Sequence, residues 1–215
     1  MDPARPQFRV LPCGDRAVLL APADPAQVLA LLARIDAAGA PAVAELVPAA
    51  ETVLVRAAAG FGTDELTRVL RSISSEESGA AAALSSDTRE LTLHVVYDGP
   101  DLDEVGRLTG LGAGGVVASH TDRVWTVAFC GFAPGFGYLR SDGDPLAVAR
   151  RDTPRTRVPS GSVGLAGPYT GVYPTPSPGG WQLIGRSGAR LWDVARTPPA
   201  LLVPGTRVRF RAVVR

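Results

Sequence analysis

The residues best suited to chemistry in this sequence lie between positions 120 and 181. The densest cationic run comprises Arg150, Arg151, Arg155 and Arg157, and it leads into Ser160-Gly-Ser162. Guanidinium groups bind carboxylate and phosphate oxygens through paired hydrogen bonds, and hydroxyls and amides beside glycine can complete an anion site. The run therefore predicts an anion site. An equally good alternative is a solvated strand edge whose arginines pair with Asp144 and Asp152.

His120 is a second candidate, because a histidine can move a proton near neutral pH. It stands a few residues before a predicted strand over 124–129. The alternative is a surface or strand-end histidine that only bonds to backbone. Cys130 could be a nucleophile with His120 as its base, but nothing nearby predicts a lowered thiol pKa, which favours a buried and inert cysteine. With only Cys13 besides, we expect neither a disulfide nor a metal site.

Thr170, Tyr173, Ser177 and Trp181 supply hydroxyls and aromatic rings between proline-rich turns. They could line a ligand groove, or they could pack the lip of a barrel. The region from 129 to 185 holds 11 of the 24 glycines and 8 of the 19 prolines, a density that leaves little room for helix. Many short strands joined by turns are typical of an antiparallel barrel.

The first part of the chain has a different pattern, in which predicted strands alternate with predicted helices. Alternating apolar residues predict strands over 8–11, 17–21, 43–47 and 52–56, and periodic apolar residues predict helices that begin near Asp24 and Thr63. We expect an α+β protein with a small N-terminal α/β sandwich domain (ββαββα) over 1–80, a linker over 81–90 and a barrel domain over 91–215. A short helix from Pro100 to Leu108 should end in the glycines of 110–115.

Composition excludes several classes of function. The net charge is +1, and all 22 basic residues are arginine, so we expect neither a nucleic-acid surface nor a phosphate-binding loop of the type that requires lysine. No apolar run is long enough to cross a membrane, and residues 1–8 lack the apolar core of a signal peptide, so the expected location is cytoplasmic.

Three sequence motifs then narrow the choice of protein family. They are Gly131-Phe-x-Pro-Gly-Phe-x-Tyr-Leu139, Pro154-Arg-x-x-Val-Pro-x-Gly-Ser-Val163 and Thr170-Gly-Val-Tyr-Pro-x-x-Ser-Pro-Gly-Gly-Trp-Gln-Leu-Ile-Gly185. These motifs, in this order, closely resemble the signature of the family of 5-oxoprolinase B subunits, also called allophanate hydrolase subunit 1 or KipI-like carboxyltransferase-domain proteins. The resemblance implies that the C-terminal domain is a cyclophilin-like antiparallel β-barrel.

The resemblance also implies a protein that acts with a related C-type subunit, or allophanate hydrolase subunit 2-like protein, and with a possible third partner, the A-type subunit of 5-oxoprolinase. The complex would use ATP, with Mg²⁺, to open the lactam of the small molecule 5-oxoproline to glutamate. This chain would hold neither ATP nor Mg²⁺ tightly. His120 and Arg155 would be catalytic, and Arg157 would contact the cofactor. Substrate contacts would come from the hydroxyl-bearing residues Ser160, Ser162, Thr170, Tyr173 and Ser177.

Two departures from the family pattern leave the bound molecule open. Many relatives carry alanine where this chain has Ser160, and Gly-Gln where it has Pro168-Tyr169. Two other functions remain as alternatives: a KipI-like inhibitor of a sensor histidine kinase, and the carboxyltransferase part of a urea carboxylase and allophanate system.

Overall fold

Each of the two units of this chain is built around its own β-sheet. The computed structural model describes residues 8–75 and 90–214, and its contacts divide the chain into residues 1–88 and 89–215. The predicted linker over 81–90 lies outside the described residues except for Glu90, which begins the first strand of the second unit.

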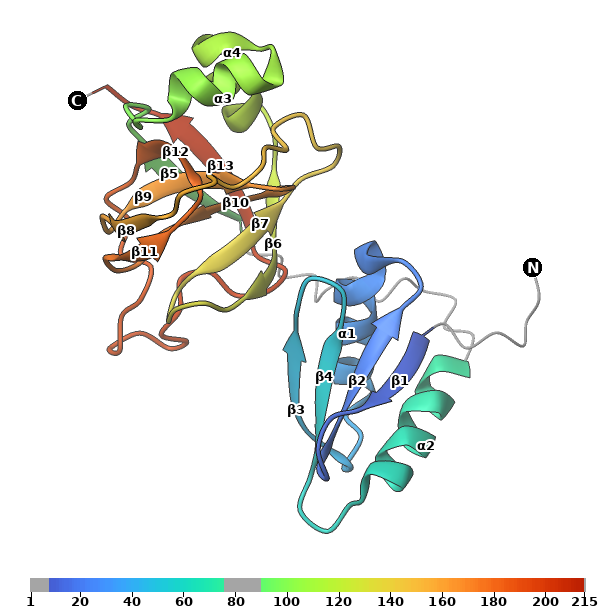
Figure 1. Cartoon of the computed structure of the whole chain (residues 1–215). Helices are drawn as coiled ribbons and strands as arrows, with labels where there is room; N and C mark the ends of the chain where they lie inside the picture. Colours follow the sequence, from blue (N-terminus) through green and yellow to red (C-terminus); the bar gives the residue numbers. More distant parts are fainter. Residues whose placement is uncertain (1–7, 76–89, 215) are drawn as a thin grey trace. The chain divides into compact units, whose positions relative to one another are not determined.

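The N-terminal unit is a four-stranded antiparallel sheet with two helices (Figure 1). Its elements are β1 (Phe8–Pro12), β2 (Ala17–Pro22), a 3-10 turn η1 (Pro25–Gln27), α1 (Val28–Ala38), β3 (Val43–Pro48), β4 (Val53–Ala57) and α2 (Thr63–Ser75). The strand order is β1-β2-β4-β3. The side chain of Asp24 accepts a hydrogen bond from the Ala26 amide and so starts the helical segment as predicted. Apolar residues of both helices bury against the sheet, which gives this unit its own core.

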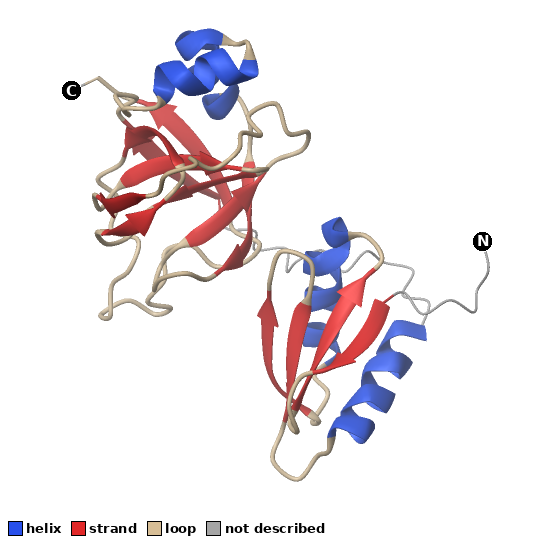
Figure 2. Ribbon diagram, viewed as in Figure 1, coloured by secondary structure: helices blue, strands red, loops and turns tan. Residues whose placement is uncertain are grey.

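The second unit is a barrel of short strands with two helices beside it (Figure 2). Its elements are β5 (Glu90–Val95), α3 (Leu102–Thr109), α4 (Gly112–Thr121), β6 (Trp125–Cys130), β7 (Gly137–Arg140), β8 (Arg155–Val158), β9 (Ser162–Ala166), β10 (Tyr169–Val172), β11 (Ser177–Gly179), β12 (Gln182–Arg186) and β13 (Arg207–Ala212). Seven strands form one sheet in the order β12-β9-β10-β7-β6-β13-β5, and β8 pairs with β11 as a separate ribbon. The predicted α+β class with a barrel is confirmed.

The sheet closes on itself where the segment after β5 meets β12. Val96 and Arg186 exchange two backbone hydrogen bonds of 2.9 Å, and the Gly99 amide donates to the Ile184 carbonyl at 3.2 Å. We call this contact between residues 96–101 and β12 the seam. Closure leaves neither edge of the seven-stranded sheet unpaired at this point, which is how barrels satisfy their edge strands.

Two features of this unit differ from the prediction. β5 and β13 are parallel, with Glu90 opposite Arg207, whereas the sequence predicts an antiparallel barrel. These are the first and last strands of the unit, so no tight hairpin forces them to be antiparallel. The second feature is α4, which begins at Gly112 within a glycine run that predicts only the end of a helix. Helices α3 and α4 pack closely because residue 106 of α3 is glycine: a Cβ there would lie 2.6 Å from the carbonyl carbon of Gly112.

The barrel interior is apolar and continuous. Its members come from nearly every strand and from both helices, and they include Val105, Val116, Val127, Val163 and Phe210. Within residues 8–75 and 90–214, no helix is both long and apolar enough to span a bilayer. The same residues contain no cluster of three or more His, Cys, Asp or Glu side chains suited to a metal ion.

Candidate functional site

A cavity of about 330 Å³ lies over the seam of the barrel. Its lining combines guanidinium groups and hydroxyls with bare backbone. The residues that line it are Asp98, Gly99, Pro100, Arg155, Arg157, Pro159, Ser160, Ser162, Leu183, Gly185 and Arg186. Four predicted site residues, Arg155, Arg157, Ser160 and Ser162, are therefore brought together by the fold. Their roles remain predictions.

Glycine makes the backbone part of this lining possible. A Cβ on Gly185 would lie 2.6 Å from the Val96 carbonyl oxygen, and one on Gly99 would lie 2.3 Å from the Ile184 carbonyl carbon. Real side chains do not tolerate such distances, so the two segments can meet at the seam only because neither residue has a side chain. Part of the cavity wall is therefore main chain.

The arginines come from strand β8. Arg155 and Arg157 are two positions apart in a strand, so their side chains leave the same face. Val158 faces the other way and is fully buried beneath them. The period of two in this short strand thus turns two guanidinium groups toward the cavity while anchoring the strand by one apolar residue.

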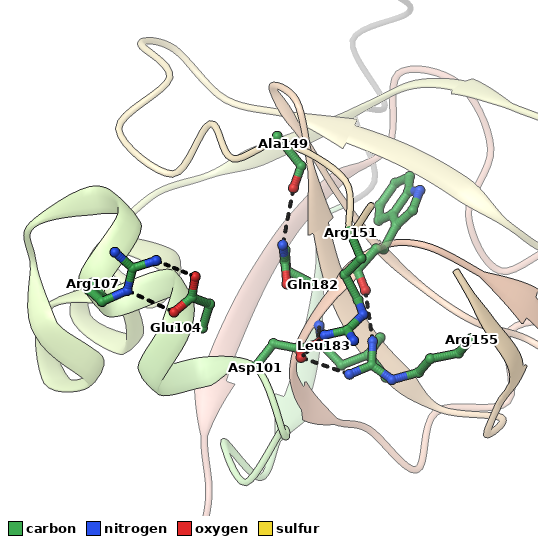
Figure 3. Close-up of polar contacts among 9 residues, drawn as sticks. Asp101, Glu104, Arg107, Ala149, Arg151, Arg155, Gln182 and Leu183 are labelled. Carbon is green, nitrogen blue, oxygen red and sulfur yellow. Dashed lines mark hydrogen bonds and ion pairs between the residues drawn. The ribbon is translucent and has the colours of Figure 1, made fainter. Parts of the chain in front are cut away.

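Arg155 is held in place by a buried aspartate (Figure 3). Asp101 is 4% exposed, and its Oδ1 accepts hydrogen bonds from Arg155 Nη2 at 2.7 Å and Arg151 Nη1 at 2.9 Å. Its Oδ2 accepts from the Leu183 amide at 2.6 Å, while Arg155 Nη1 donates to the Trp181 carbonyl at 3.4 Å. These charge-assisted bonds fix the orientation of the Arg155 guanidinium.

The other cations of the cavity are bound differently. Arg186 forms a two-pronged ion pair with Asp98, with distances of 2.9 to 3.1 Å. Arg157 is exposed, and no hydrogen bond or ion pair joins it to another residue of the two described ranges. Its guanidinium is therefore available to a ligand. The alternative pairing of this arginine run with Asp144 is wrong, since Asp144 pairs with Arg140 at 3.4 Å.

The two serines are in different states. Ser160 Oγ donates to the Pro174 carbonyl at 2.8 Å. Ser162 is 6% exposed, yet its hydroxyl has no hydrogen-bond partner among residues 8–75 and 90–214. It alternates along β9 with Val163, which faces the barrel core, so Ser162 faces outward toward the cavity. An unpaired hydroxyl at a cavity wall is suited to bind a ligand oxygen.

His120 lies away from this cavity, inside the barrel unit. It is 0% exposed on helix α4, with Nδ1 2.7 Å from the Tyr97 hydroxyl and Nε2 2.8 Å from Thr170 Oγ1. Thr170 in turn donates to the Gly164 carbonyl at 3.2 Å. This direction of bonding places the proton on Nε2 and leaves Nδ1 to accept from Tyr97. Burial, assisted by the charge of Arg123, lowers the His120 pKa to about 3.

These surroundings favour a structural role for His120 and Thr170, and their roles in proton transfer and substrate binding stay predictions. Neither the strand-end nor the surface alternative describes a fully buried histidine. Cys130 also matches the inert alternative, because burial raises its thiol pKa to about 11 and its Sγ lies 3.4 Å from the Leu202 carbonyl oxygen. A thiol with so high a pKa is a poor nucleophile near neutral pH.

The remaining candidates lie in or near an aromatic cluster. Tyr173 is 2% exposed and packs edge-to-face against Phe136 and Trp181. Ser177 begins β11, where its Oγ lies 3.4 Å from the Thr175 carbonyl oxygen. Neither residue lines the cavity described above. Their predicted part in substrate binding would need a second surface, and packing of the barrel lip is the role that their contacts display.

Sequence reasoning missed the acidic half of the site. Pro100-Asp101 predicts a helix start, and Asp101 does precede α3, but its carboxylate makes no capping hydrogen bond and binds two arginines instead. The pairing partners are 50 and 54 positions away. A single acidic residue before a helix carries no local signal for such a pairing. Asp98 and Arg186 were missed for the same reason.

The chain matches one family model and several curated proteins. The carboxyltransferase domain, subdomain C and D, matches residues 8–202, which include all three signature motifs. The B subunit of 5-oxoprolinase from Escherichia coli O157:H7 is 43% identical over 175 residues, covering 79% of this chain and 78% of that protein. The B subunit of 5-oxoprolinase from Bacillus subtilis is 45% identical over 112 residues, covering 52% and 47%.

Solved structures agree on the fold. TTHA0988 matches with a TM-score of 0.75 and 33% identity over 94% of this chain, which spans 40% of that longer chain. PH0987 from Pyrococcus horikoshii matches with a TM-score of 0.56 and 31% identity, covering 95% of this chain and 97% of that one. Kluyveromyces lactis urea carboxylase, at 19% identity and a TM-score of 0.65, covers all of this chain and shares the fold. This chain therefore belongs to the family of the carboxyltransferase domain, subdomain C and D.

Proposed function

We propose that this chain is the B-type subunit of an ATP-dependent 5-oxoprolinase complex, which hydrolyses the lactam of 5-oxoproline to L-glutamate. The observation that carries the proposal is the 43% identity, across more than three quarters of both chains, with a protein named as the B subunit of 5-oxoprolinase. The cavity fits the proposal because its cationic and hydroxyl groups suit an anionic substrate.

A lactam is an unreactive amide, and phosphorylation of its oxygen by ATP makes the carbonyl carbon open to attack by water. Stabilisation of the charge that develops requires fixed donors rather than mobile ones. Arg155 suits this role, because Asp101 and the Trp181 carbonyl fix its guanidinium. We propose that Arg155 acts at the cavity wall and that ATP and Mg²⁺ act in the assembled complex.

Partner proteins belong to the same proposal. The curated relatives are named as B subunits, which implies an enzyme with other subunits, and we propose the C-type and A-type subunits of 5-oxoprolinase as partners of this chain. The longer chain of TTHA0988 supports the idea that this fold works beside additional polypeptide.

Reconstitution tests the proposal directly. The chain is co-expressed with its C-type and A-type partners, and glutamate release from L-5-oxoproline is measured with and without ATP. We expect ATP-dependent release that disappears when this chain is left out. An intact complex of all three proteins that releases no glutamate above the background without ATP would defeat the proposal.

The kinase-inhibitor and carboxyltransferase alternatives remain predictions. The likeness to urea carboxylase at 19% identity concerns the fold alone. No contact in the described residues favours either alternative over the proposed lactam hydrolysis.

A further inference from the structure

We infer that the cavity over the seam binds the carboxylate of a small substrate, through Arg157 and Ser162, and that these two residues do not hold the nucleotide. The identity of that substrate as 5-oxoproline rests on the proposed function, whereas the carboxylate site rests on the geometry. The inference gives Arg157 to the substrate rather than to the cofactor, the role predicted from the sequence.

Charge at the cavity favours an anionic ligand. The carboxylate of Asp101 is shared by two arginines, and Asp98 neutralises Arg186. The guanidinium of Arg157 is the one on the cavity wall that meets no carboxylate within the described ranges. Asp101 supplies one negative charge for its two arginine partners, so these three residues together carry one excess positive charge, and Arg157 adds a second. The Arg157 guanidinium can therefore bind one carboxylate through paired hydrogen bonds.

The unpaired hydroxyl of Ser162 supplies the second contact. Ser162 is opposite Arg186 in the pairing of β9 with β12, so it lies next to the strand that forms the seam and lines the same cavity as Gly185. The residue as a whole is 6% exposed, and its hydroxyl lines the cavity without a hydrogen-bond partner in the described residues, so it can bond to a ligand oxygen there. A carboxylate held between a guanidinium and a hydroxyl has each of its oxygens bonded to a donor.

Cavity size argues in the same direction. A volume of about 330 Å³ is at the lower end of the range of ligand pockets, roughly 300 to 1,000 Å³. A five-membered lactam with one carboxylate is much smaller than a nucleotide and can enter such a space with its ring against the Leu183 side of the wall. A nucleoside triphosphate would remain largely outside it.

Asp101 then acts as a positioning residue. By holding Arg155 at 2.7 Å it prevents that guanidinium from swinging toward Arg157 and competing for the same carboxylate. The two arginines of β8 therefore differ in function although they are chemically identical: Arg155 is fixed, and Arg157 is free to bind.

Ligand binding to the purified full chain tests the inference. Calorimetric titrations use L-5-oxoproline, pyrrolidin-2-one (the same lactam without the carboxylate), inorganic phosphate and MgATP. We expect binding of L-5-oxoproline and no measurable binding of pyrrolidin-2-one, phosphate or MgATP in the same concentration range. Absence of L-5-oxoproline binding, equal binding of pyrrolidin-2-one, or displacement of L-5-oxoproline by phosphate or MgATP would each overturn the inference.

Variants locate the site. Arg157→Gln should weaken L-5-oxoproline binding about 10-fold or more, and Ser162→Ala should weaken it about 3- to 10-fold, because the first removes a charged donor and the second a neutral one. Arg68→Gln, the same change at an exposed residue of α2, is the matched control and should bind as the wild type does. Unchanged binding by Arg157→Gln contradicts the inference. Failure of the complex to release glutamate, with binding intact, contradicts only the proposed function.

Discussion

Asp101 and Arg155 are 54 positions apart in the sequence, and Asp101 Oδ1 accepts a hydrogen bond from Arg155 Nη2 at 2.7 Å beside the cavity. The carboxylate also binds Arg151 and the Leu183 amide. One buried acid thus connects the segment before α3, the approach to β8 and the start of β12. Its loss should affect both stability and ligand binding.

Asp101→Asn should lower the free energy of unfolding by about 2 kcal/mol or more, because an amide offers one acceptor where the carboxylate offers two and leaves cationic partners without their counter-charge. Chemical denaturation of the full chain measures the change. Asp98→Asn is the matched control: its ion pair with Arg186 is exposed, and such pairs contribute about 0 to 1 kcal/mol. Equal losses for the two variants would contradict the special position of Asp101.

Arg155→Ala should reduce glutamate release by the reconstituted complex about 100-fold, since removal of one fixed donor to a developing charge has an effect of this order. The barrel should remain folded, because Asp101 keeps Arg151 and the Leu183 amide as partners. Near-ultraviolet circular dichroism checks the fold and a glutamate assay checks the activity. Turnover within about 2-fold of wild type would remove Arg155 from the proposed charge-stabilising role.

His120 should remain neutral in the folded chain down to low pH. Burial lowers its pKa to about 3, below the ordinary value of 6.5, so the unfolded chain binds a proton that the folded chain does not. The contribution of His120 to stability is therefore fully present above pH 6.5 and is lost as the pH falls toward 3, by up to about 1.4 kcal/mol per pH unit.

Two measurements check this behaviour. The imidazole resonances of His120 should show no titration between about pH 7 and pH 5, and replacement of His120 by Gln should reduce the pH dependence of unfolding in that range. His94→Gln, at an exposed position of β5, serves as the control substitution. A His120 ring that titrates near its ordinary pKa of 6.5 in the folded chain would refute the prediction.

Gly185→Ala should destabilise the barrel by about 1 to 3 kcal/mol, because its methyl group would approach the Val96 carbonyl oxygen to 2.6 Å and force the seam apart. Thermal unfolding reports the loss. Gly188→Ala, three positions later, is the control, since nothing lies within 4 Å of a Cβ at that residue. A Gly185→Ala protein as stable as Gly188→Ala would show that the seam can relax.

Local patterns predicted most of the strands and the first helices, because period-two and helical spacing of apolar residues reports directly on burial. The same patterns predicted a short element over Val116 to His120 but missed that it is a helix, α4, which begins at Gly112. Three of its residues are glycines, at 112, 114 and 115. Gly112 has a φ of +67°, a conformation that favours glycine, and the close approach of the Gly112 backbone explains why residue 106 of the neighbouring helix is also glycine. His120 lies on α4, so the error in that element also misplaced this histidine.

One side of the cavity, its wall of arginines and serines, was predictable from the sequence, and the seam was not. Arg155, Arg157, Ser160 and Ser162 stand close together in the sequence, and short-range spacing was enough to group them. The seam that gives the cavity its floor joins residues 96–101 to β12, a pairing set by closure of the whole sheet. No local pattern encodes that pairing.

The glycine backbone at the seam also bears on how this protein can diversify. Closure of the barrel depends on Gly99 and Gly185, whereas the groups that would touch a ligand extend from β8, from the turn that follows it and from the first residue of β9. Mutations on that wall can therefore alter which molecule is accepted while the closure contacts stay intact. Related barrels can in this way evolve specificity for different ligands while every intermediate variant remains folded.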